Sequence, residues 1–447
     1  MEILKGLLGA LLRSRILSIT TTTHHPSPQH AVMGDSGVAI DRRRTSIVNT
    51  KQKNRGTPHS QRIKTAIRSF RVLRGLTPAQ VDAFLASYTI YSLDWSDEKK
   101  MVDTLGPDYQ QKVGACLSDY YGVLNHLCAI GDLEKMYIPP AMDLSQSIVQ
   151  NQILYEESIV DHLRLPPNAK VLDLGCGRGR VAAHISTLTG ASVTGLNIDA
   201  DQVASAKTYT ATHHLPNTFQ THDFNILPLP FSSASFDGFY QIQAFSLCAD
   251  LPALCSELYR ILRPGARLSL LDWASLPAYD ASNPEHIKLM TRIKPLIGAV
   301  GTPTPASLTL ALEGAGFRMV KSENVSIDGL QAPLIEKADG TFCAVKRVVE
   351  GAVKVGLLPA HFKTLLERLT KDCDAFVEAD RRRLVTTSWC WVAEKVGGEE
   401  SGGGSSEKSG GSGSEDSEES GKSGGGSGSQ TVRLVVDNAE HDGAVAR

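Results

Sequence analysis

Three glycines at alternate positions mark the stretch of this 447-residue chain best suited to chemistry. Gly175, Gly177 and Gly179 follow the apolar run 170–174, which has strand character, and the chain turns helical at 181–185. Glycine has no Cβ and tolerates positive φ, so the backbone at such a turn can come very close to a ligand. A strand, a glycine-rich turn and a helix in this order predict a site for a nucleotide-sized ligand.

The spacing of the glycines and one acid distinguish two ligands. A dinucleotide-binding turn has the pattern G-x-G-x-x-G and places a pyrophosphate on the helix N-terminus. Here the pattern is G-x-G-x-G, and Asp173 inside the strand end would repel a pyrophosphate but could bind a cation. S-adenosylmethionine (AdoMet) carries an ammonium and a sulfonium, so the charge pattern favours AdoMet over NAD. Asp173 is expected to hold the ammonium, directly or through water; its place inside the strand argues against a helix-capping role.

Residues 171–180 resemble motif I of the class I AdoMet-dependent methyltransferases. The wider region from about Tyr120 to Val320 is similar to the sterol 24-C-methyltransferase family. Three further motifs carry this narrower resemblance: Thr189–Asn197, Glu257–Gly265 and Asn283–His286. The resemblance implies an AdoMet-dependent methyltransferase with AdoMet as its cofactor.

The same resemblance implies residues for the rest of the cofactor. The end of the second strand usually offers an acid to the two ribose hydroxyls, but this chain has Asn197 there, as the sterol enzymes do, and Asn197 can accept one hydrogen bond and donate another. We expect Asn197 first and Gln202 second to bind the ribose. Asp223 and Phe224 match the family's adenine-binding pair, a carboxylate for the exocyclic amine and an aromatic face for the ring. Alternatively, Asp223 forms an Asx-turn into Asn225.

The catalytic signatures of the sterol family are absent. The family has a Tyr-Glu-Tyr-Gly-Trp-Gly type of signature before the core, where this chain has residues 126–133. After the fourth strand the family has Ile-Glu-Ala-Thr-Cys-His, and residues 242–247 read Ile-Gln-Ala-Phe-Ser-Leu. The acid has become Gln243 and the histidine Leu247. Carbocation stabilisation and deprotonation by that pair therefore cannot be carried over.

Several polar or aromatic side chains remain near the expected acceptor site, and three of them are nominated for catalysis. The full set is Tyr120, Tyr121, His126, Asp132, Glu134, Tyr137, Gln243, Ser246, Asp272 and Trp273. His126 is the one group there that titrates near neutral pH, so we nominate it as a base, against the alternative of a buried lid histidine. Gln243 is expected to position the acceptor or the methionine end. Tyr121 lies near the expected acceptor site. Methyl transfer is an in-line displacement, so positioning is the main task of these residues.

Strands and helices alternate through the middle of the chain, which predicts an α/β fold with a doubly wound, mostly parallel, Rossmann-like sheet. The resemblance adds an antiparallel hairpin at the end of the sheet, with 384–396 as one arm. The predicted strands are 171–174, 192–196, 219–222, 238–241, 267–271 and 317–323, and the predicted helices are 179–188, 200–208, 252–262, 284–297, 305–314 and 341–370.

Composition divides the chain into four parts. We expect residues 1–61 to form a disordered basic arm, 62–150 a helical lid that excludes water from the substrate end, 151–396 the methyltransferase domain, and 397–447 a low-complexity Gly/Ser/Glu tail. Thr77 and Pro78 are expected to begin one lid helix.

The charges are uneven along the chain. Residues 1–75 hold 14 Lys and Arg against 3 Asp and Glu, although the whole chain has a formal charge of −2. This arm could contact a membrane surface peripherally or remain a solvated extension. No aromatic residue is interleaved with the early basic ones, so nucleic acid is not expected.

Residues 1–17 are too short and too charged to span a bilayer. They fit an interfacial helix or a targeting presequence, and Met33 is an alternative start. We expect a cytoplasmic protein, with peripheral contact at the endoplasmic reticulum membrane as an option. The eight cysteines show no C-x-x-C pair and no metal-ligand spacing, so they predict free thiols in a reducing compartment and no metal site.

These patterns support three hypotheses. The first is a methyltransferase acting on a lipophilic small molecule, such as a terpenoid, a sterol-like compound or another secondary metabolite, at carbon, nitrogen or oxygen. The second is a true sterol 24-C-methyltransferase with a changed base. The third is a non-catalytic AdoMet-binding scaffold, which the intact glycine turn disfavours.

Overall fold

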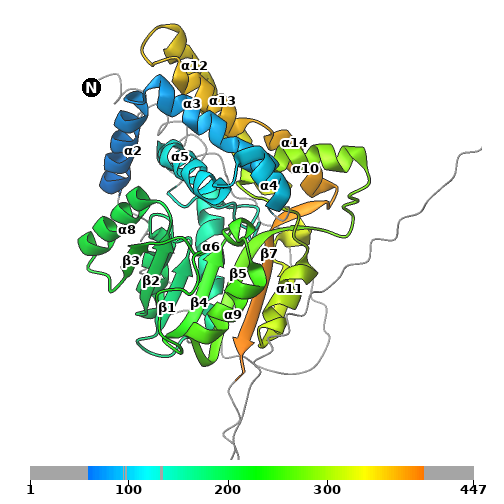
Figure 1. Ribbon diagram of the computed structural model, residues 1–447. Helices are drawn as coiled ribbons and strands as arrows, with labels where there is room; N and C mark the ends of the chain where they lie inside the picture. The colour runs from blue at the N-terminus through cyan, green and yellow to red at the C-terminus, as the bar shows by residue number, and fades with distance from the viewer. Residues whose placement is uncertain (1–58, 94, 96–97, 131–133, 397–447) are drawn as a thin grey trace, which may run out of the picture. The chain divides into compact units, whose positions relative to one another are not determined.

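A seven-stranded sheet with the strand order β3-β2-β1-β4-β5-β7-β6 forms the centre of the fold (Figure 1). The computed structural model describes residues 59–93, 95, 98–130 and 134–396. The predicted tail 397–447 and the predicted arm up to residue 58 lie outside these residues. The strands are β1 (Lys170–Leu174), β2 (Ser192–Asn197), β3 (Thr218–Thr221), β4 (Phe236–Ile242), β5 (Leu262–Ser275), β6 (Phe317–Asn324) and β7 (Val385–Lys395).

The first five strands are parallel, and β7 runs antiparallel between β5 and β6. The sheet is therefore mostly parallel, as predicted, and the tryptophan-containing strand is one arm of the predicted antiparallel end. In β1 only Lys170 is exposed, because a central parallel strand is covered on both faces.

Helices cover both faces of the sheet, so the doubly wound arrangement is confirmed. Leu172 and Leu174 of β1 pack with α9 (Leu251–Ile261) and α11 (Pro305–Gly314). Val171, on the opposite face, packs with the second helical layer. That layer contains α6 (Ile148–Leu163), α7 (Arg180–Thr189) and α8 (Ala200–Thr212).

A separate helical layer lies over one end of the sheet (Figure 1). This layer has its own apolar core, built from two distant parts of the chain. Leu73, Phe84 and Tyr120 precede β1 in the sequence, and Phe362 and Leu365 follow β6. We call this layer the lid. It consists of α2 (His59–Arg74), α3 (Pro78–Ser87), α4 (Glu98–Leu105), α5 (Tyr109–Ile130), α12 (Ala332–Lys354) and α13 (His361–Thr370). Beside it, α10 (Pro284–Ile297) and α14 (Cys373–Arg381) pack on each other.

The structure differs from the sequence predictions at four places. Helix α2 begins at His59, within the predicted arm 1–61, and α6 spans the predicted domain boundary between residues 150 and 151. The segment 341–370 is mostly helical, as predicted, but it belongs to two helices, because a turn with Gly356 at φ 73° separates α12 from α13. Both of these helices belong to the lid rather than to the sheet layer, and α14 was not predicted. In the described part of the chain, no helix is long and apolar enough to cross a membrane.

Candidate functional site

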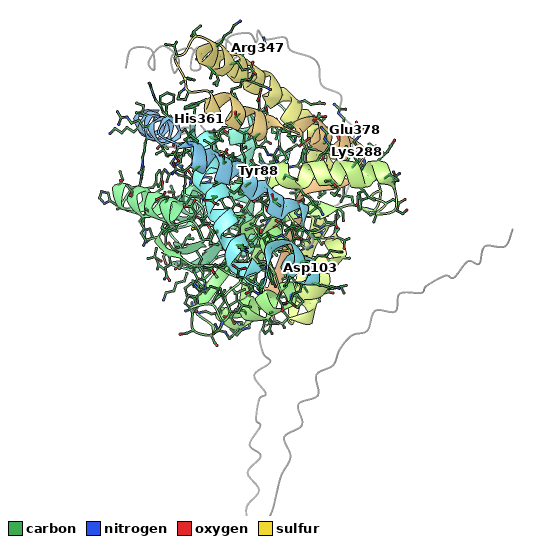
Figure 2. The ribbon with its side chains drawn as sticks, turned by 45° about the horizontal axis from the view of Figure 1, so that its top comes forward. Tyr88, Asp103, Lys288, Arg347, His361 and Glu378 are labelled. Carbon is green, nitrogen blue, oxygen red and sulfur yellow. The ribbon has the colours of Figure 1, made fainter. Side chains whose placement is uncertain are left out.

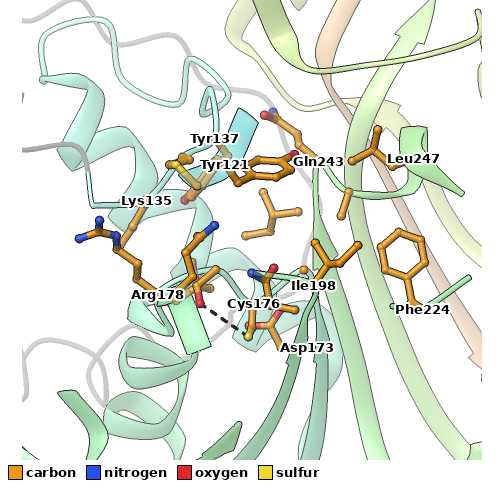
Figure 3. Close-up of a pocket in the computed structure, with 18 of the residues that line it drawn as sticks. Tyr121, Lys135, Tyr137, Asp173, Cys176, Arg178, Ile198, Phe224, Gln243 and Leu247 are labelled. Atoms are coloured by element: carbon orange, nitrogen blue, oxygen red, sulfur yellow. Dashed lines mark hydrogen bonds between the residues drawn. The ribbon is translucent and has the colours of Figure 1, made fainter. Parts of the chain in front are cut away.

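A cavity lies at the carboxyl ends of β1, β2 and β4, beneath α5 and the segment 134–137. Figure 3 shows Asp173 on one side of this cavity and Tyr121 and Gln243 on the opposite side. Ligands of open α/β sheets bind at this edge. The apolar part of the lining is Leu117, Met136, Val181, Ile198, Ile242, Phe224 and Leu247.

Two of the three motif glycines border the cavity. Gly175 and Gly177 have φ values of 77° and 52°, in the region that favours glycine. A Cβ on Gly175 would lie 2.8 Å from the Cβ of Ala244, and one on Gly177 would lie 3.2 Å from Oε1 of Gln202. The glycines therefore keep this wall of the cavity open for a ligand.

Gly179 has a different role. It does not line the cavity but precedes α7 as its N-cap, with φ 69°. A Cβ there would lie 2.8 Å from both Ala206 and Phe219, which pack beneath the turn. Gly179 thus allows α7 to pack closely on its neighbours.

Asp173 reaches the cavity from the end of β1. Its carboxylate is buried, and its Oδ2 accepts a hydrogen bond of 2.7 Å from the hydroxyl of Tyr240. Burial raises the pKa of Asp173 to about 7; the bond from Tyr240 lowers it, and the charge of Glu156 raises it further. An ammonium group would offset the burial of this carboxylate, so Asp173 is suited to the amine of AdoMet.

Asn197 and Gln202 present unpaired polar atoms to the same cavity. Among the described residues, nothing hydrogen-bonds to Nδ2 of Asn197 or to Oε1 of Gln202, although both atoms are buried. The orientation of Gln202 is fixed, because its Nε2 donates to Oδ2 of Asp199 at 3.0 Å. One unpaired donor beside one unpaired acceptor suits a ribose diol, whose hydroxyls both accept and donate. The residues present therefore fit AdoMet.

Asp223 and Phe224 also line the cavity. Oδ1 of Asp223 accepts a 2.9 Å hydrogen bond from the backbone N–H of Asn225, which is the Asx-turn that the sequence left open. The two interpretations are compatible, since no described residue donates to Oδ2. The adenine amine could bind that second oxygen.

A buried carboxylate organises the wall beside Asp173. Glu156 of α6 is fully buried and accepts hydrogen bonds from Lys135 at 2.5 and 2.6 Å, Tyr137 at 2.8 Å and His184 at 2.7 Å. Although burial raises the pKa of Glu156, the charge of Lys135 and the bonds from Lys135 and His184 hold it below its usual value. Glu156 therefore fixes Lys135 and Tyr137, which line the cavity.

Two arginines of motif I attach the lid to the glycine turn. Nη2 of Arg178 donates to the side chain of Asn125 on α5 at 2.7 Å, and Asn125 in turn donates to Asp199 at 3.3 Å. Nε of Arg180 donates to Glu134 at 2.8 Å. These buried, charge-assisted contacts hold the lid closed over the cofactor end of the cavity.

Gln243 lies at the acceptor end, where its amide is fully occupied. Its Oε1 accepts from the N–H of Ile138 at 3.0 Å, and its Nε2 donates to the carbonyls of Ile138 and Thr387 at 2.8 and 2.9 Å. Its φ of 52° is unusual for a residue other than glycine. Gln243 therefore shapes the cavity by joining three segments, and its predicted role in positioning the acceptor or the methionine end stays a prediction.

Tyr121 is the sequence candidate that projects a hydroxyl-bearing ring into the acceptor end. Burial raises its pKa to about 12, and the charges of Asp272 and Asp199 act in the same direction. The phenol is therefore neutral at physiological pH. It can donate a hydrogen bond or offer its ring face, but it is a poor base.

The structure does not bring His126 to the cavity. Nδ1 of His126 lies 3.1 Å from Oγ of Ser69 on α2, inside the lid, and the ring is absent from the cavity lining. Burial lowers the pKa of His126 to about 4, and the charge of Arg178 lowers it too. The alternative of a satisfied lid histidine therefore describes its surroundings, and we do not use it as the base.

Comparison with known proteins places these features in a family. Residues 172–270 match the family described as "Methyltransferase domain". A methyltransferase named phqN from Penicillium fellutanum is 30% identical over 243 residues, which cover 54% of this chain and 71% of that protein. The chain belongs to the class I AdoMet-dependent methyltransferases.

Within this methyltransferase family, the sterol-like character is also shown. The sterol 24-C-methyltransferase of Pneumocystis carinii is 28% identical over 275 residues, covering 56% of this chain and 72% of the relative. The botryococcene C-methyltransferase of Botryococcus braunii is 35% identical over 186 residues, covering 41% and 47%. The enzyme is therefore a sterol-methyltransferase-like methyltransferase, and AdoMet is its cofactor.

The sequence did not predict the roles of residues whose partners lie far away along the chain. Asp272 at the end of β5 accepts from Gln241 at 2.7 Å and from the N–H of Phe245 at 2.8 Å, and so fixes the loop that carries Gln243. Asp272 was expected near the acceptor site, but this role was not predicted because its partners lie in other segments. Glu156 and Asn125 were not predicted at all.

Proposed function

We propose that this methyltransferase transfers a methyl group to a lipophilic small molecule of the terpenoid or sterol type. The observation that carries the proposal is the acceptor end of the cavity. There Leu117, Tyr121, Ile242 and Leu247 provide apolar or aromatic surface, and the Gln243 amide is already occupied. A pocket of this kind favours a ligand held by burial rather than by charge. The names of the sterol and botryococcene relatives support the same class.

The cofactor would be held in a defined orientation. Asp173 would bind the ammonium, Asn197 and Gln202 the ribose diol, and Asp223 with Phe224 the adenine. When bound, AdoMet supplies an electrophilic methyl group. With the ammonium held at Asp173, the methyl group would face the opposite side of the cavity, which carries Tyr121, and an acceptor there could react in line with the methyl–sulfur bond.

The chain's own contribution would be to position the acceptor and to exclude water. Arg180 is paired with Glu134, and Lys135 is paired with Glu156, so these four charges neutralise one another within the protein. Tyr121 could offer its ring face to positive charge that develops on an alkene acceptor, an attraction of about 1–2 kcal/mol in a desolvated site.

Incubation of the purified protein with methyl-labelled AdoMet tests the proposal. Acceptors would include a linear terpenoid alkene, a sterol with a side-chain double bond, an aromatic amine, a phenol and an extract of lipids and metabolites from the host. Label in a terpenoid or sterol product would support the proposal. Label only in the amine or phenol would refute it, and AdoMet binding without any product would favour the scaffold.

A true sterol 24-C-methyltransferase is the second candidate, favoured by the Pneumocystis carinii relative. It would need a base other than Gln243 or Leu247, which occupy the places of the family's acid and histidine. Labelling of the sterol alone, at its side-chain double bond, would select this candidate over the broader terpenoid class.

A further inference from the structure

The outer end of the lid combines exposed aliphatic side chains with a concentration of positive charge. Four aliphatic side chains are exposed there: Val355 by 68%, Leu357 by 43%, and Val72 and Val348 by 39% each. They come from the end of α2, the second half of α12 and the turn between α12 and α13. We call this surface the lid tip, with residues 64–76 and 346–363.

Two contacts show that these segments are neighbours. Nε2 of His361 lies 2.8 Å from the carbonyl oxygen of Leu73, and the rings of Phe70 and Phe362 are 5.5 Å apart. In Figure 2 His361 lies beside the blue helix α2, and Arg347 lies on the helix at the top of the view. The tip is therefore one continuous surface.

The aliphatic side chains of the turn are held outward by ordered backbone. The N–H of Gly356 donates to the carbonyl of Val353 at 3.0 Å, and that of Leu357 donates to the carbonyl of Ala352 at 2.9 Å. This pair of bonds, with Gly356 in the left-handed region, is the Schellman motif that ends a helix. The next residue, Leu358, turns into the lid core, so Val355 and Leu357 remain outside.

The charge of the tip is predominantly positive. Residues 64–76 contain Lys64, Arg68, Arg71 and Arg74 and no acid, and residues 346–363 contain four Lys or Arg against one acid, Glu350. Lys363 forms an i,i+4 pair with Glu367 at 3.8 Å. Among the described residues, no acid forms an ion pair with Arg71, Arg74, Arg347 or Lys354.

The geometry points to docking of the lid tip on an anionic lipid bilayer. Exposed aliphatic side chains ringed by cations suit the boundary between acyl chains and negatively charged headgroups. A protein that bound the lid tip would need an apolar centre surrounded by acidic side chains. An anionic bilayer always presents negatively charged headgroups next to an apolar acyl phase. Nucleic acid offers the charge but no apolar phase for Val355 and Leu357.

Helix α13, whose first residues belong to the tip, is also connected to the cavity. The guanidinium of Arg368 on α13 lies 3.6 Å from the ring centroid of Tyr88, and the rings of Tyr88 and Tyr120, then Tyr120 and Tyr121, follow at 5.1 and 5.0 Å. Tyr121 lines the acceptor end. Docking would thus place the lid that covers this end against the phase in which a lipophilic acceptor dissolves.

Vesicle flotation of the full-length protein tests the inference. The probes are phosphatidylcholine vesicles with and without phosphatidylserine, at low and high salt. The wild type should bind the anionic vesicles, fail to bind the neutral ones and lose binding as salt rises. The assay needs neither an acceptor nor turnover, so its result does not depend on the proposed function.

Two double variants separate the apolar and charged contributions. Val355→Glu with Leu357→Glu should weaken binding by about tenfold or more, the effect of withdrawing at least one aliphatic side chain from the acyl boundary. Arg347→Gln with Lys354→Gln should weaken it about 30-fold, from about fivefold for each cation near an anionic surface. None of these residues lines the cavity, so AdoMet binding should be unchanged and reports that each variant is folded.

Leu310→Glu is the matched control, because Leu310 on α11 is exposed by the same 68% outside the lid. It should bind vesicles as the wild type does. The inference is overturned if the wild type does not bind anionic vesicles, or if both double variants bind them normally, which would leave another segment as the anchor. Conversion of a dimer to a monomer by Val355→Glu with Leu357→Glu, without a change in vesicle binding, would overturn it in favour of self-association.

Discussion

Replacement of Asp173 by Asn should have opposite effects on the free protein and on the complex. The folded-state pKa of about 7 lies above the ordinary value of 3.8. Ionisation of this buried carboxyl therefore costs the folded protein about 4 kcal/mol, at about 1.4 kcal/mol per pKa unit. The cost is fully present above pH 7 and is lost as the pH falls towards 4, because the folded state then retains the proton.

Asp173→Asn removes that cost while its amide oxygen can still accept from Tyr240. At pH 8 the free variant should be more stable than the wild type by up to about 4 kcal/mol, and at pH 5 the difference should be much smaller. In the complex, the ammonium of AdoMet loses its carboxylate. Loss of one partner of a buried charge pair costs about 2 kcal/mol or more, so AdoMet should bind at least about 30-fold more weakly.

Calorimetry at several pH values measures both effects. In the wild type, AdoMet binding should weaken about tenfold per unit below pH 7, since the carboxyl must release its proton to pair with the ammonium. The variant should lack this dependence. Asp250→Asn is a matched control, because Asp250 caps α9 and Asn caps a helix equally well. The reasoning fails if Asp173→Asn binds AdoMet like the wild type, or if the free variant is less stable at pH 8.

Three further perturbations separate the roles of neighbouring residues. Gly177→Ala should weaken AdoMet binding about tenfold and lower the free energy of unfolding by about 1–2 kcal/mol through its positive φ alone, whereas Gly179→Ala should lower it by about 3 kcal/mol through positive φ and the 2.8 Å approaches. A larger stability loss in Gly177→Ala, or a larger loss of AdoMet binding in Gly179→Ala, in paired urea and binding titrations would contradict the assignment. Glu156→Gln should lower the free energy of unfolding by about 3–5 kcal/mol, because Lys135 would lose its buried counter-charge. An unchanged urea midpoint would refute this. His126→Ala should leave the pH dependence of kcat unaltered on any acceptor identified, and a lost basic limb in that profile would restore His126 as the base.

The parts of the fold specified by local chemistry were predictable. Helices α10 and α11 match their predicted ranges to the residue, because each begins with a capping side chain followed by proline: Asn283 before Pro284, and Thr304 before Pro305. The glycine turn and β1 could likewise be predicted from a short segment of sequence. At these places the sequence within a few residues determines the backbone.

The rest of the site depends on contacts between distant segments. Asn125 meets Arg178 across 53 residues and Gln243 meets Thr387 across 144. No periodicity or motif reports such a pairing. His126 shows the same limit of sequence-based prediction. It lies on a helix with several faces, and the sequence alone did not determine that its ring contacts Ser69 rather than the cavity.

The lid's composite origin has a consequence for how the chain folds during synthesis. Helices α2 to α5 leave the ribosome first, but part of the apolar surface that they cover belongs to α12 and α13, more than 200 residues later. Until those helices emerge, side chains such as Leu73 and Phe84 lack some of their native neighbours. The nascent chain therefore carries an incomplete hydrophobic cluster while all the parallel strands are being synthesised. This exposed apolar surface is one to which chaperones can bind. If synthesis stops before α12, the cluster stays exposed.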